Sequence, residues 1–442
     1  MRRPSLNKVL KVGSVGISLL LLTASAFASA DGERQLKDPD PKIRVMGAKL
    51  LGQEEDPNNV PILATAVQDK DEKVRMAVVK SLVHLGTRAS LAPLSKAVQD
   101  GIPEIRYLAI DGLINFYLPG YIDTGFGGFF RSIGNKVEGM FSDTDTAVVA
   151  ADVKADPDVI KTLSNALNGA PDTETRVRAA RALGILRAQT AVPDLLQAAF
   201  SNNVDVILAT LGAFNKIKDP SVGPRITFLL NYPQKSVQEA AATTVGLLRT
   251  ESAIPDLQKM FQNASDKEKD VRAAALDALA FMPTKDTAAL FTQYLADKDK
   301  RLRTSSALGL GRLQDASYLP TLQKAAGAEK DTSVRLALDF AFVKNGKLDG
   351  LSELVSNLSS RVHRGEAVPY LTELAREPKI RESLRPYLGS RDADVRKNLC
   401  DVYAASGDAA SISYLEDLTR DRDPEVANEA NRAIRIIRAR GI

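Results

Sequence analysis

Three residue types are scarce in this chain: tryptophan is absent, cysteine occurs once and histidine twice. A single cysteine excludes any disulfide within the chain, and no Cys/His spacing typical of a metal site is present. Cys400 stands at an apolar position of VRKNLCDVYA, which predicts a small buried side chain. A phosphate-binding glycine loop and a serine nucleophile elbow are also missing. We therefore expect no catalytic residue, no metal and no cofactor.

Acidic residues are missing from the first thirty positions. The chain opens with four cations, continues with the run VGSVGISLLLLTASAF and ends this segment with the small-residue pattern AFASA. This layout predicts a secretory signal peptide over residues 1–30, cleaved after Ala28 or Ala30. A retained transmembrane anchor is the alternative, but the run is shorter than the roughly 20 residues of a membrane span. We expect an exported protein, periplasmic or extracellular.

An excess of positive charge is missing once this leader is set aside. The remaining chain carries 55 basic residues against 55 acidic ones. A protein that binds nucleic acid normally has a large basic excess, because contacts to phosphate supply most of its affinity. The balance therefore argues against nucleic acid as a partner.

What the chain does contain is a signature that returns about every 31 residues. Its first copies are DPDPKIRVMGAKLLG from Asp38, DKDEKVRMAVVKSLVHLG from Asp69 and GIPEIRYLAIDGL from Gly101. The arginine of the signature stands at Arg44, Arg75, Arg106, Arg178, Arg272, Arg303, Arg335 and Arg396. A fixed period of this length is typical of a protein built from stacked repeats.

Each repeat predicts two helices. The first begins at a capping Asp, Ser or Thr, has apolar residues at helical spacing and ends at glycine, as at Gly52, Gly86 and Gly184. The second has a proline near its first turn. These prolines are Pro61, Pro93, Pro193, Pro255, Pro320 and Pro369. Because one helix pair cannot bury both apolar faces, the repeats must stack. The sequence predicts an all-α fold, an α-solenoid of about twelve two-helix repeats.

The motif D-x-x-V-R-x-x-A-x-x-A-L-G, followed by a helix that proline starts, resembles the HEAT-like repeats of the phycobilisome-lyase type. The resemblance covers nearly all of residues 38–442. It implies the solenoid fold but leaves the function open, since this family includes bilin lyases, hydroxylases and plain scaffolds. The hydroxylase branch holds iron with His-Glu pairs, and neither His84 nor His363 is followed by Glu.

Two stretches depart from the period. Arg106 and Arg178 are 72 positions apart, which places an insertion at residues 117–156, between HEAT-like repeats at 31–116 and 157–343. Arg335 and Arg396 are 61 positions apart, nearly two periods. We interpret residues 344–390 as one degenerate repeat, followed by C-terminal repeats at 391–442.

The insertion holds most of the clustered aromatic residues, within GFGGFFRSIGNKVEGMF and the residues before it. Its apolar side chains follow helical spacing, which predicts a short amphipathic helix. The candidate binding residues are Tyr121, Phe126, Phe129, Phe130, Ile133, Val137, Met140 and Phe141. This apolar face could be covered by the protein's own groove, by a partner protein or by a membrane surface. The opposite face of the helix is only weakly basic, which argues against strong attraction to anionic lipid.

The recurring arginines are interpreted as a structural ladder, in which each guanidinium pairs with acids or carbonyls of an adjacent turn. An anion-binding row is the alternative. The paired aspartates of D-x-D segments, such as Asp69 and Asp71, are interpreted as helix caps, because the other ligands of a calcium loop are missing.

These observations predict an exported scaffold that binds a protein partner. Its expected contact surfaces are the concave face of the solenoid and the aromatic insertion. The main alternative is an enzyme or chromophore-handling protein of the lyase-like branch. A peripheral membrane protein is the second alternative.

Overall fold

The computed structural model describes residues 29–118, 148–150, 153–265 and 267–440. The regular elements of these residues are helices, so the prediction of an all-α solenoid is confirmed. The described residues form two compact units. The first holds residues 29–118 and 155–195, and the second holds residues 148–150, 153–154 and 196 onward. None of the described helices has the length and apolar character needed to cross a membrane.

The first helices of the repeats form one layer. Their bounds are α2 (Pro41–Gln53), α4 (Glu72–Leu85), α6 (Pro103–Asn115), α9 (Thr173–Ile185), α11 (Val204–Ile217), α13 (Lys235–Leu247), α15 (Lys269–Phe281), α17 (Lys300–Leu313), α19 (Thr332–Lys344), α21 (Arg364–Leu374), α23 (Ala393–Ser406) and α25 (Pro424–Ala439). In the first unit, α2, α4, α6 and α9 pack in this order, each against the next. In the second unit, the helices from α11 to α25 do the same.

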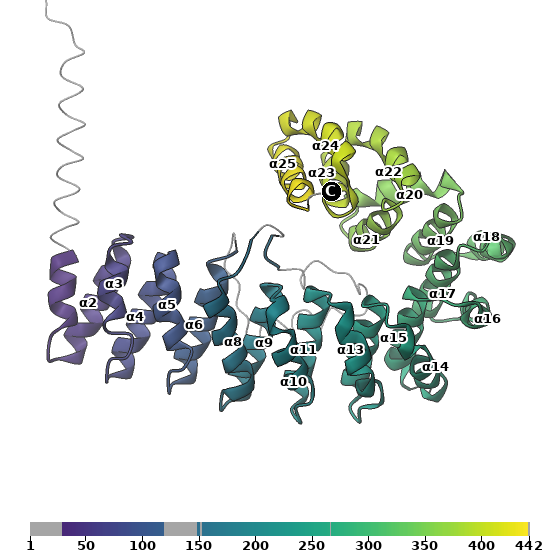
Figure 1. The fold of residues 1–442 in the computed structure, drawn as a ribbon. Coiled ribbons are helices and arrows are strands. Elements are labelled where there is room, and N and C mark those ends of the chain that lie inside the picture. The colour runs from purple at the N-terminus through teal and green to yellow at the C-terminus, as the bar shows by residue number, and fades with distance from the viewer. Residues whose placement is uncertain (1–28, 119–147, 151–152, 266, 441–442) are drawn as a thin grey trace, which may run out of the picture. The chain divides into compact units, whose positions relative to one another are not determined.

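The second helices of the repeats form the other layer. Their bounds are α3 (Asn59–Ala64), α5 (Leu91–Ala97), α8 (Pro157–Gly169), α10 (Val192–Ala199), α12 (Gly223–Ile226), α14 (Ile254–Asn263), α16 (Lys285–Tyr294), α18 (Leu319–Ala328), α20 (Leu351–Ser356), α22 (Pro378–Leu384) and α24 (Ala409–Glu416). Figure 1 shows α14, α16 and α18 on the same side of the row formed by α15, α17 and α19.

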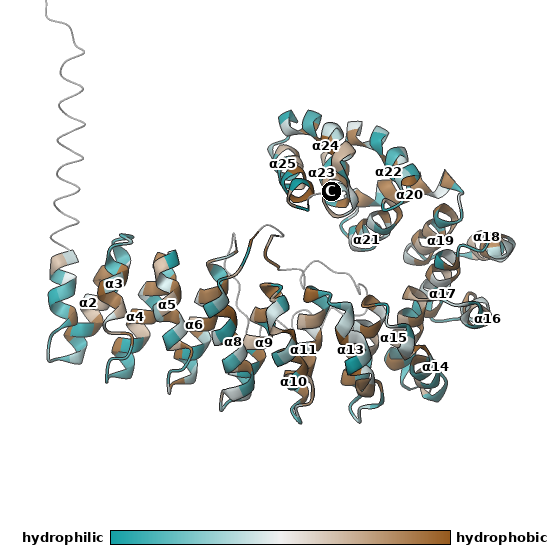
Figure 2. Ribbon diagram, viewed as in Figure 1, coloured by the Kyte–Doolittle hydropathy of each residue, from teal (hydrophilic) through white to brown (hydrophobic). Residues whose placement is uncertain are grey.

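Short 3₁₀ helices complete many of the connections. They are η2 (Arg88–Ser90), η4 (Gln189–Ala191), η5 (Pro220–Val222), η6 (Thr227–Asn231), η7 (Glu251–Ala253), η8 (Ala316–Tyr318), η9 (Leu348–Gly350), η10 (Asn357–Ser359), η11 (Arg385–Gly389) and η12 (Asp417–Arg420). Figure 2 shows hydrophobic and hydrophilic residues on the helices of both layers. Fully buried apolar side chains come from both, such as Leu63 of α3 and Leu82 of α4, so the core lies between the two layers.

The helix α4 illustrates how the sequence sets each first helix. The Asp71 side chain accepts hydrogen bonds from the free backbone amides of Lys73 and Val74, which begins the helix. Gly86 ends it with φ of 54°, a left-handed conformation that glycine adopts without steric cost. Between them, Val74 and Leu82 are fully buried. The expected use of D-x-D segments as caps is confirmed here and at the other first helices that follow such a segment.

Two of the expected glycine ends are wrong, because Gly52 and Gly184 lie inside α2 and α9. At Gly52 the cause is close packing, since an added Cβ would lie 2.4 Å from the Ser81 hydroxyl of α4. Pro369 was expected near a helix start but lies in the middle of α21. That helix begins earlier, at Arg364, and belongs to the layer of first helices, so the expected place of Pro369 in a second helix is also wrong. Proline has no amide to donate the backbone hydrogen bond of a helix interior.

The insertion lies within the third repeat of the stack. It separates α6 from α8, yet α6 packs directly against α9. The described ends of the insertion also meet, because the Asp156 amide donates a hydrogen bond to the Tyr117 hydroxyl at 3.0 Å. Asp156 then caps α8. The stack of first helices therefore continues across the insertion without a break.

A buried ion pair ties α21, within the residues interpreted as a degenerate repeat, to the repeats before it. Arg312 of α17 donates to both carboxylate oxygens of Glu373 on α21, at 2.9 to 3.2 Å. Its guanidinium also donates to the Ala280 carbonyl at 2.9 Å and lies 4.5 Å above the Phe281 ring. Only 6% of the Arg312 side chain is exposed. This contact skips one repeat and holds α21 against the stack.

Candidate functional site: the arginine ladder and the Arg335 pocket

A signature arginine can contact both the residues that precede its own helix and an acid of the next repeat. The guanidinium of Arg44 donates to the carbonyls of Asp38 and Pro39, which precede its own helix, at 3.0 and 2.9 Å. Its other side donates two parallel hydrogen bonds, both 2.8 Å long, to the Asp69 carboxylate of the next repeat. Such a bidentate pair fixes the geometry as well as adding energy. Each arginine of this kind therefore joins two successive turns.

The same fork recurs in other repeats. The guanidinium and the carboxylate that it binds are 25 or 26 positions apart. The pairs are Arg44 with Asp69, Arg75 with Asp100, Arg303 with Glu329 and Arg396 with Asp421. Burial alone would raise the pKa of Asp69, but hydrogen bonds from Arg44 and the Asp71 amide hold it below its ordinary value. The carboxylate therefore stays charged in the pair.

The ladder also crosses the insertion. Arg106 binds the Asp172 carboxylate at 2.6 Å and the Thr175 hydroxyl at 3.0 Å, although these partners come more than sixty residues later. Tyr107 donates a further hydrogen bond to Asp172 at 2.9 Å. Burial opposes ionisation of Asp172, but hydrogen bonds from Thr175, Arg106 and Tyr107 lower its pKa to about 2.

Two ladder arginines use other partners. Arg178 binds Asp111 of the preceding first helix at 2.8 Å and Glu174 of its own helix at 2.7 Å. Asn203, which stands 25 positions after Arg178, offers no carboxylate. Arg272 donates to the Tyr294 hydroxyl at 2.9 Å and lies 5.1 Å above the Phe261 ring.

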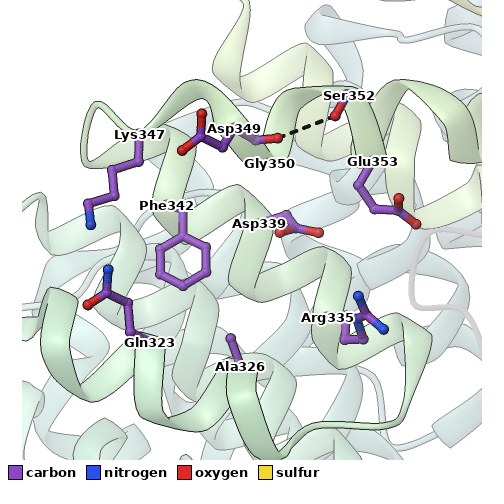
Figure 3. A pocket seen from close by; sticks show the side chains of 10 residues that line it. All are labelled: Gln323, Ala326, Arg335, Asp339, Phe342, Lys347, Asp349, Gly350, Ser352 and Glu353. Carbon is purple, nitrogen blue, oxygen red and sulfur yellow. Dashed lines mark hydrogen bonds between the residues drawn. The ribbon is translucent and has the colours of Figure 1, made fainter.

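Arg335 is the exception, since its side chain makes no hydrogen bond or ion pair within the described residues. The positions 25 and 26 residues later hold Ser360 and Arg361, so the carboxylate of the next repeat is replaced by a hydroxyl and a cation. The Arg335 side chain instead lines a cavity of about 510 Å³, shown in Figure 3.

We call this cavity the Arg335 pocket. Its lining residues come from α18, α19 and the segment that contains η9 and the start of α20. They are Gln323, Ala326, Arg335, Asp339, Phe342, Lys347, Asp349, Gly350, Ser352 and Glu353. Two bases and three acids therefore face one cavity beside an aromatic ring.

Asp339 is the most perturbed group of the Arg335 pocket. Its carboxylate accepts no hydrogen bond from the described residues. Burial and the nearby charge of Glu353 raise its pKa to about 6, against the opposing charge of Arg335. Gly350 packs closely against it, since an added Cβ there would lie 3.0 Å from the Asp339 Cβ. Perturbed acids in a cavity are frequent at functional sites.

The aromatic candidates of the insertion lie outside the described residues. These are Tyr121, Phe126, Phe129, Phe130, Ile133, Val137, Met140 and Phe141. Their role as a contact face stays a prediction. Among the residues that are described, no group of three or more His, Cys, Asp or Glu side chains is placed to hold a metal ion. Cys400 is buried, as expected, and burial raises the pKa of its thiol to about 12.

Sequence reasoning missed an exposed aromatic pair. Phe200 follows α10 and Phe228 lies in η6, and their rings stack with centroids 4.6 Å apart. Phe200 is 64% exposed and Phe228 is 40% exposed. Phe200 ends an apolar segment and Phe228 lies within one, and a sequence pattern does not separate buried from exposed positions there. Sequence reasoning also missed Asp339, which stands inside the signature copy of Arg335, and Glu353, which lies in α20.

Comparison with known proteins places the repeats in a family. The model of HEAT repeats matches residues 33–114, 261–341 and 348–435, which is more than half of the chain. The model of the PBS lyase HEAT-like repeat matches residues 175–201. No curated protein matches the chain.

Three solved structures are similar to the chain at low identity. An engineered protein is 16% identical, with 93% of this chain and 99% of that chain covered and a TM-score of 0.37. YibA of E. coli is also 16% identical, with 67% and 96% covered and a TM-score of 0.41. The complex of CpcE and CpcF of phycocyanin lyase from Nostoc sp. PCC7120 is 20% identical, with 64% and 94% covered and a TM-score of 0.34.

Proposed function

Because this chain belongs to the HEAT-repeat family, we propose that it is an exported scaffold that binds a partner protein. Stacked repeats present extended surfaces of the kind that such proteins use for binding. One observation carries the proposal. Most signature arginines form ion pairs that join one repeat to the next. Their charge is therefore used inside the stack. We assign partner binding to the other residues on the surfaces of the stack.

We assign partner binding to the concave face of the stack and to the aromatic residues of the insertion. The leader sequence supports export. The exposed stack of Phe200 and Phe228 supports binding of a partner through the repeats themselves. Large aromatic side chains dominate the energy of many protein interfaces, because they bury much apolar area at a small entropic cost.

The structure allows a clean test of the insertion. Residues 119–147 can be replaced by a short Gly/Ser linker while Tyr117 and Asp156, which hydrogen bond to each other, are kept. The stack of α6 on α9 should then remain, and the melting curve should change little. We expect the linker variant to lose the partner that the complete protein recovers from an extracytoplasmic fraction.

A matched control separates the insertion from the repeats. Phe129→Ser with Phe130→Ser changes only the insertion, and Phe200→Ser with Phe228→Ser changes only the exposed pair. Undiminished partner recovery by all three variants would refute the proposed surfaces. A large loss of thermal stability in the Phe129/Phe130 variant, with the partner still bound, would show that these rings pack within the protein itself.

A further inference from the structure

The Arg335 pocket marks the point where the ladder leaves a cation without its acid. Seven ladder arginines bind side chains of this chain, whereas Arg335 binds none within the described residues. We propose that the Arg335 pocket docks a segment of a partner protein that presents an acidic and a basic side chain about one helical turn apart. This inference rests on the proposed scaffold function and names the chemistry of one of its contacts.

The floor of the pocket is a stripe along α19. Arg335, Asp339 and Phe342 stand at positions i, i+4 and i+7 of that helix and therefore share one face. Figure 3 shows α18 residues Gln323 and Ala326 on one side of this stripe. The η9 and α20 segment borders the other side, as Figure 3 also shows. The volume of about 510 Å³ is within the roughly 300–1,000 Å³ range of pockets that take up small groups.

The charges of the pocket favour a ligand that carries both signs. Arg335 and Lys347 supply two positive charges, and Asp339, Asp349 and Glu353 supply the acids. A ligand with acids alone would be repelled by three carboxyl groups, and a ligand with bases alone would leave Arg335 without a carboxylate. An acid on Arg335 and a base between Asp339 and Glu353 satisfy both ends. The aliphatic stem of the base can lie on the Phe342 ring.

The chain itself shows that this scaffold holds such arrangements. Arg303 takes a bidentate carboxylate from Glu329, which is the contact expected for Arg335 with an acid from outside. Arg178 lies between two carboxylates, Asp111 and Glu174, as a partner's base would lie between Asp339 and Glu353. It also lies 4.8 Å above the ring of Tyr107.

The spacing of the ligand follows from the helix. Residues four positions apart on a helix have Cβ atoms roughly 5–6 Å apart. The guanidinium of Arg335 and the carboxyl group of Asp339 start from such positions on α19. A complementary acid and base at i and i+4 of a partner helix have the same spacing. A helical segment can lie on the pocket in either direction, so the order of the two charges is free.

The experiment measures peptide binding to the complete mature protein by fluorescence anisotropy. The probes are three labelled alanine-based helical peptides with Glu/Lys, Lys/Lys or Glu/Glu at positions i and i+4. We expect the Glu/Lys peptide to bind roughly fivefold more tightly than the other two, as two exposed charge pairs allow. Arg335→Glu should move the preference to Lys/Lys, and Glu353→Lys should move it to Glu/Glu. The preference should weaken as salt is added.

The control is Arg391→Glu, which makes the same charge change at an exposed residue outside the pocket. It should leave the preference of the wild-type protein unchanged. Melting curves for each variant establish that it is folded. Equal binding of the three peptides, the same preference in all four proteins, or no measurable binding at roughly 1 mM peptide would each overturn the proposal.

The outcome is separable from that of the scaffold function. If the partner is recovered by both the wild-type protein and Arg335→Glu while the peptides bind equally, the scaffold function stands and this pocket has no part in it. If the peptides discriminate as expected but no partner is recovered, the pocket chemistry stands and the assignment to the concave face and insertion falls.

Discussion

Glu373→Ala is expected to be among the most damaging single changes in the second unit. The Glu373 carboxylate accepts three hydrogen bonds from Arg312, at 2.9 to 3.2 Å, and one repeat lies between the two residues. The side chains of the pair are 6% and 16% exposed. Burial opposes ionisation of Glu373, but Arg312 holds its pKa below the ordinary value. The pair is therefore ionised and shielded from water.

The size of the loss follows from what remains after the change. Without Glu373, the Arg312 cation keeps the Ala280 carbonyl and two aromatic rings as close partners, and Asp277 as a nearby acid whose pKa is raised by burial. Removing one member of a buried pair in this way costs about 3–5 kcal/mol. Replacing both with apolar residues, as Arg312→Met with Glu373→Leu, should cost much less, because no charge is then left buried. Glu33→Ala is the control, since its exposed pair with Lys37 contributes about 0–1 kcal/mol.

The assay is urea unfolding combined with hydrogen exchange read by mass spectrometry. Stacked repeats need not unfold in one step, so exchange is followed separately in α17, α19 and α21. We expect Glu373→Ala to speed exchange in these helices, whereas Glu33→Ala leaves them unchanged. The reasoning is refuted if the two single variants have equal effects, or if the apolar double variant is as unstable as Glu373→Ala.

Three further predictions concern packing, pH and processing. Gly311→Ala should destabilise by about 1–3 kcal/mol, because its Cβ would lie 2.7 Å from an α19 Cα, whereas Gly212→Ala, with nothing within 4 Å, should stabilise by about 0.5–1 kcal/mol in the same urea titration. Burial raises the pKa of Asp277 to about 6 from 3.8, so the folded state holds its proton longer and stability falls as pH rises from about 4 to 6. Asp277→Asn should remove that slope, and an unchanged slope in urea titrations across this range would disprove the assignment. The exported chain should begin at Ser29 or Asp31, and an intact mass that includes residues 1–28 would disprove cleavage.

The fold was predictable because its causes are local. The capping Asp71 and the left-handed Gly86 are both readable from sequence, and they set the two ends of α4. The 31-residue period then requires stacking, because a single helix pair leaves apolar surface exposed. Reasoning from local sequence failed where contacts with a neighbouring repeat determine which residue is used. Gly52 is set by the approach of Ser81 from α4, which the sequence of α2 does not reveal.

The candidate site was predictable only in part. The sequence predicted eight arginines as a structural ladder, but Arg335 makes no such contact within the described residues. It also assigned D-x-D segments to capping alone. Asp69 and Asp421, the first aspartates of two such segments, are in fact the carboxylates that bind Arg44 and Arg396. The offset of 25 positions was present in the sequence as a usable signal. The contact of Arg312 with Glu373 had no such signal, because it joins a regular repeat to a degenerate one.

That offset is one difference between Arg335 and the paired arginines of the ladder. At Arg303 an acid stands 26 positions later, and the guanidinium is folded against its own turn and the next. Arg272 shows that an acid at this offset is not always used, because Asp297 stands 25 positions later but Arg272 donates to Tyr294. At Arg335 the same positions hold Ser360 and Arg361, and a hydroxyl followed by a cation cannot replace a bidentate carboxylate. The arginine then faces the cavity beside α20, which Asp339 and Glu353 also line. Asp339 accepts no hydrogen bond from the described residues, and Glu353 accepts one from the Asn357 side chain at 3.3 Å. Arg361→Asp should restore an internal acid to this position. If the missing carboxylate is the cause of the open pocket, this change should stabilise α19 against hydrogen exchange and weaken binding of the Glu/Lys peptide together. Stabilisation without weaker peptide binding would show that the acid bound elsewhere, and that the gap in the ladder does not create the pocket.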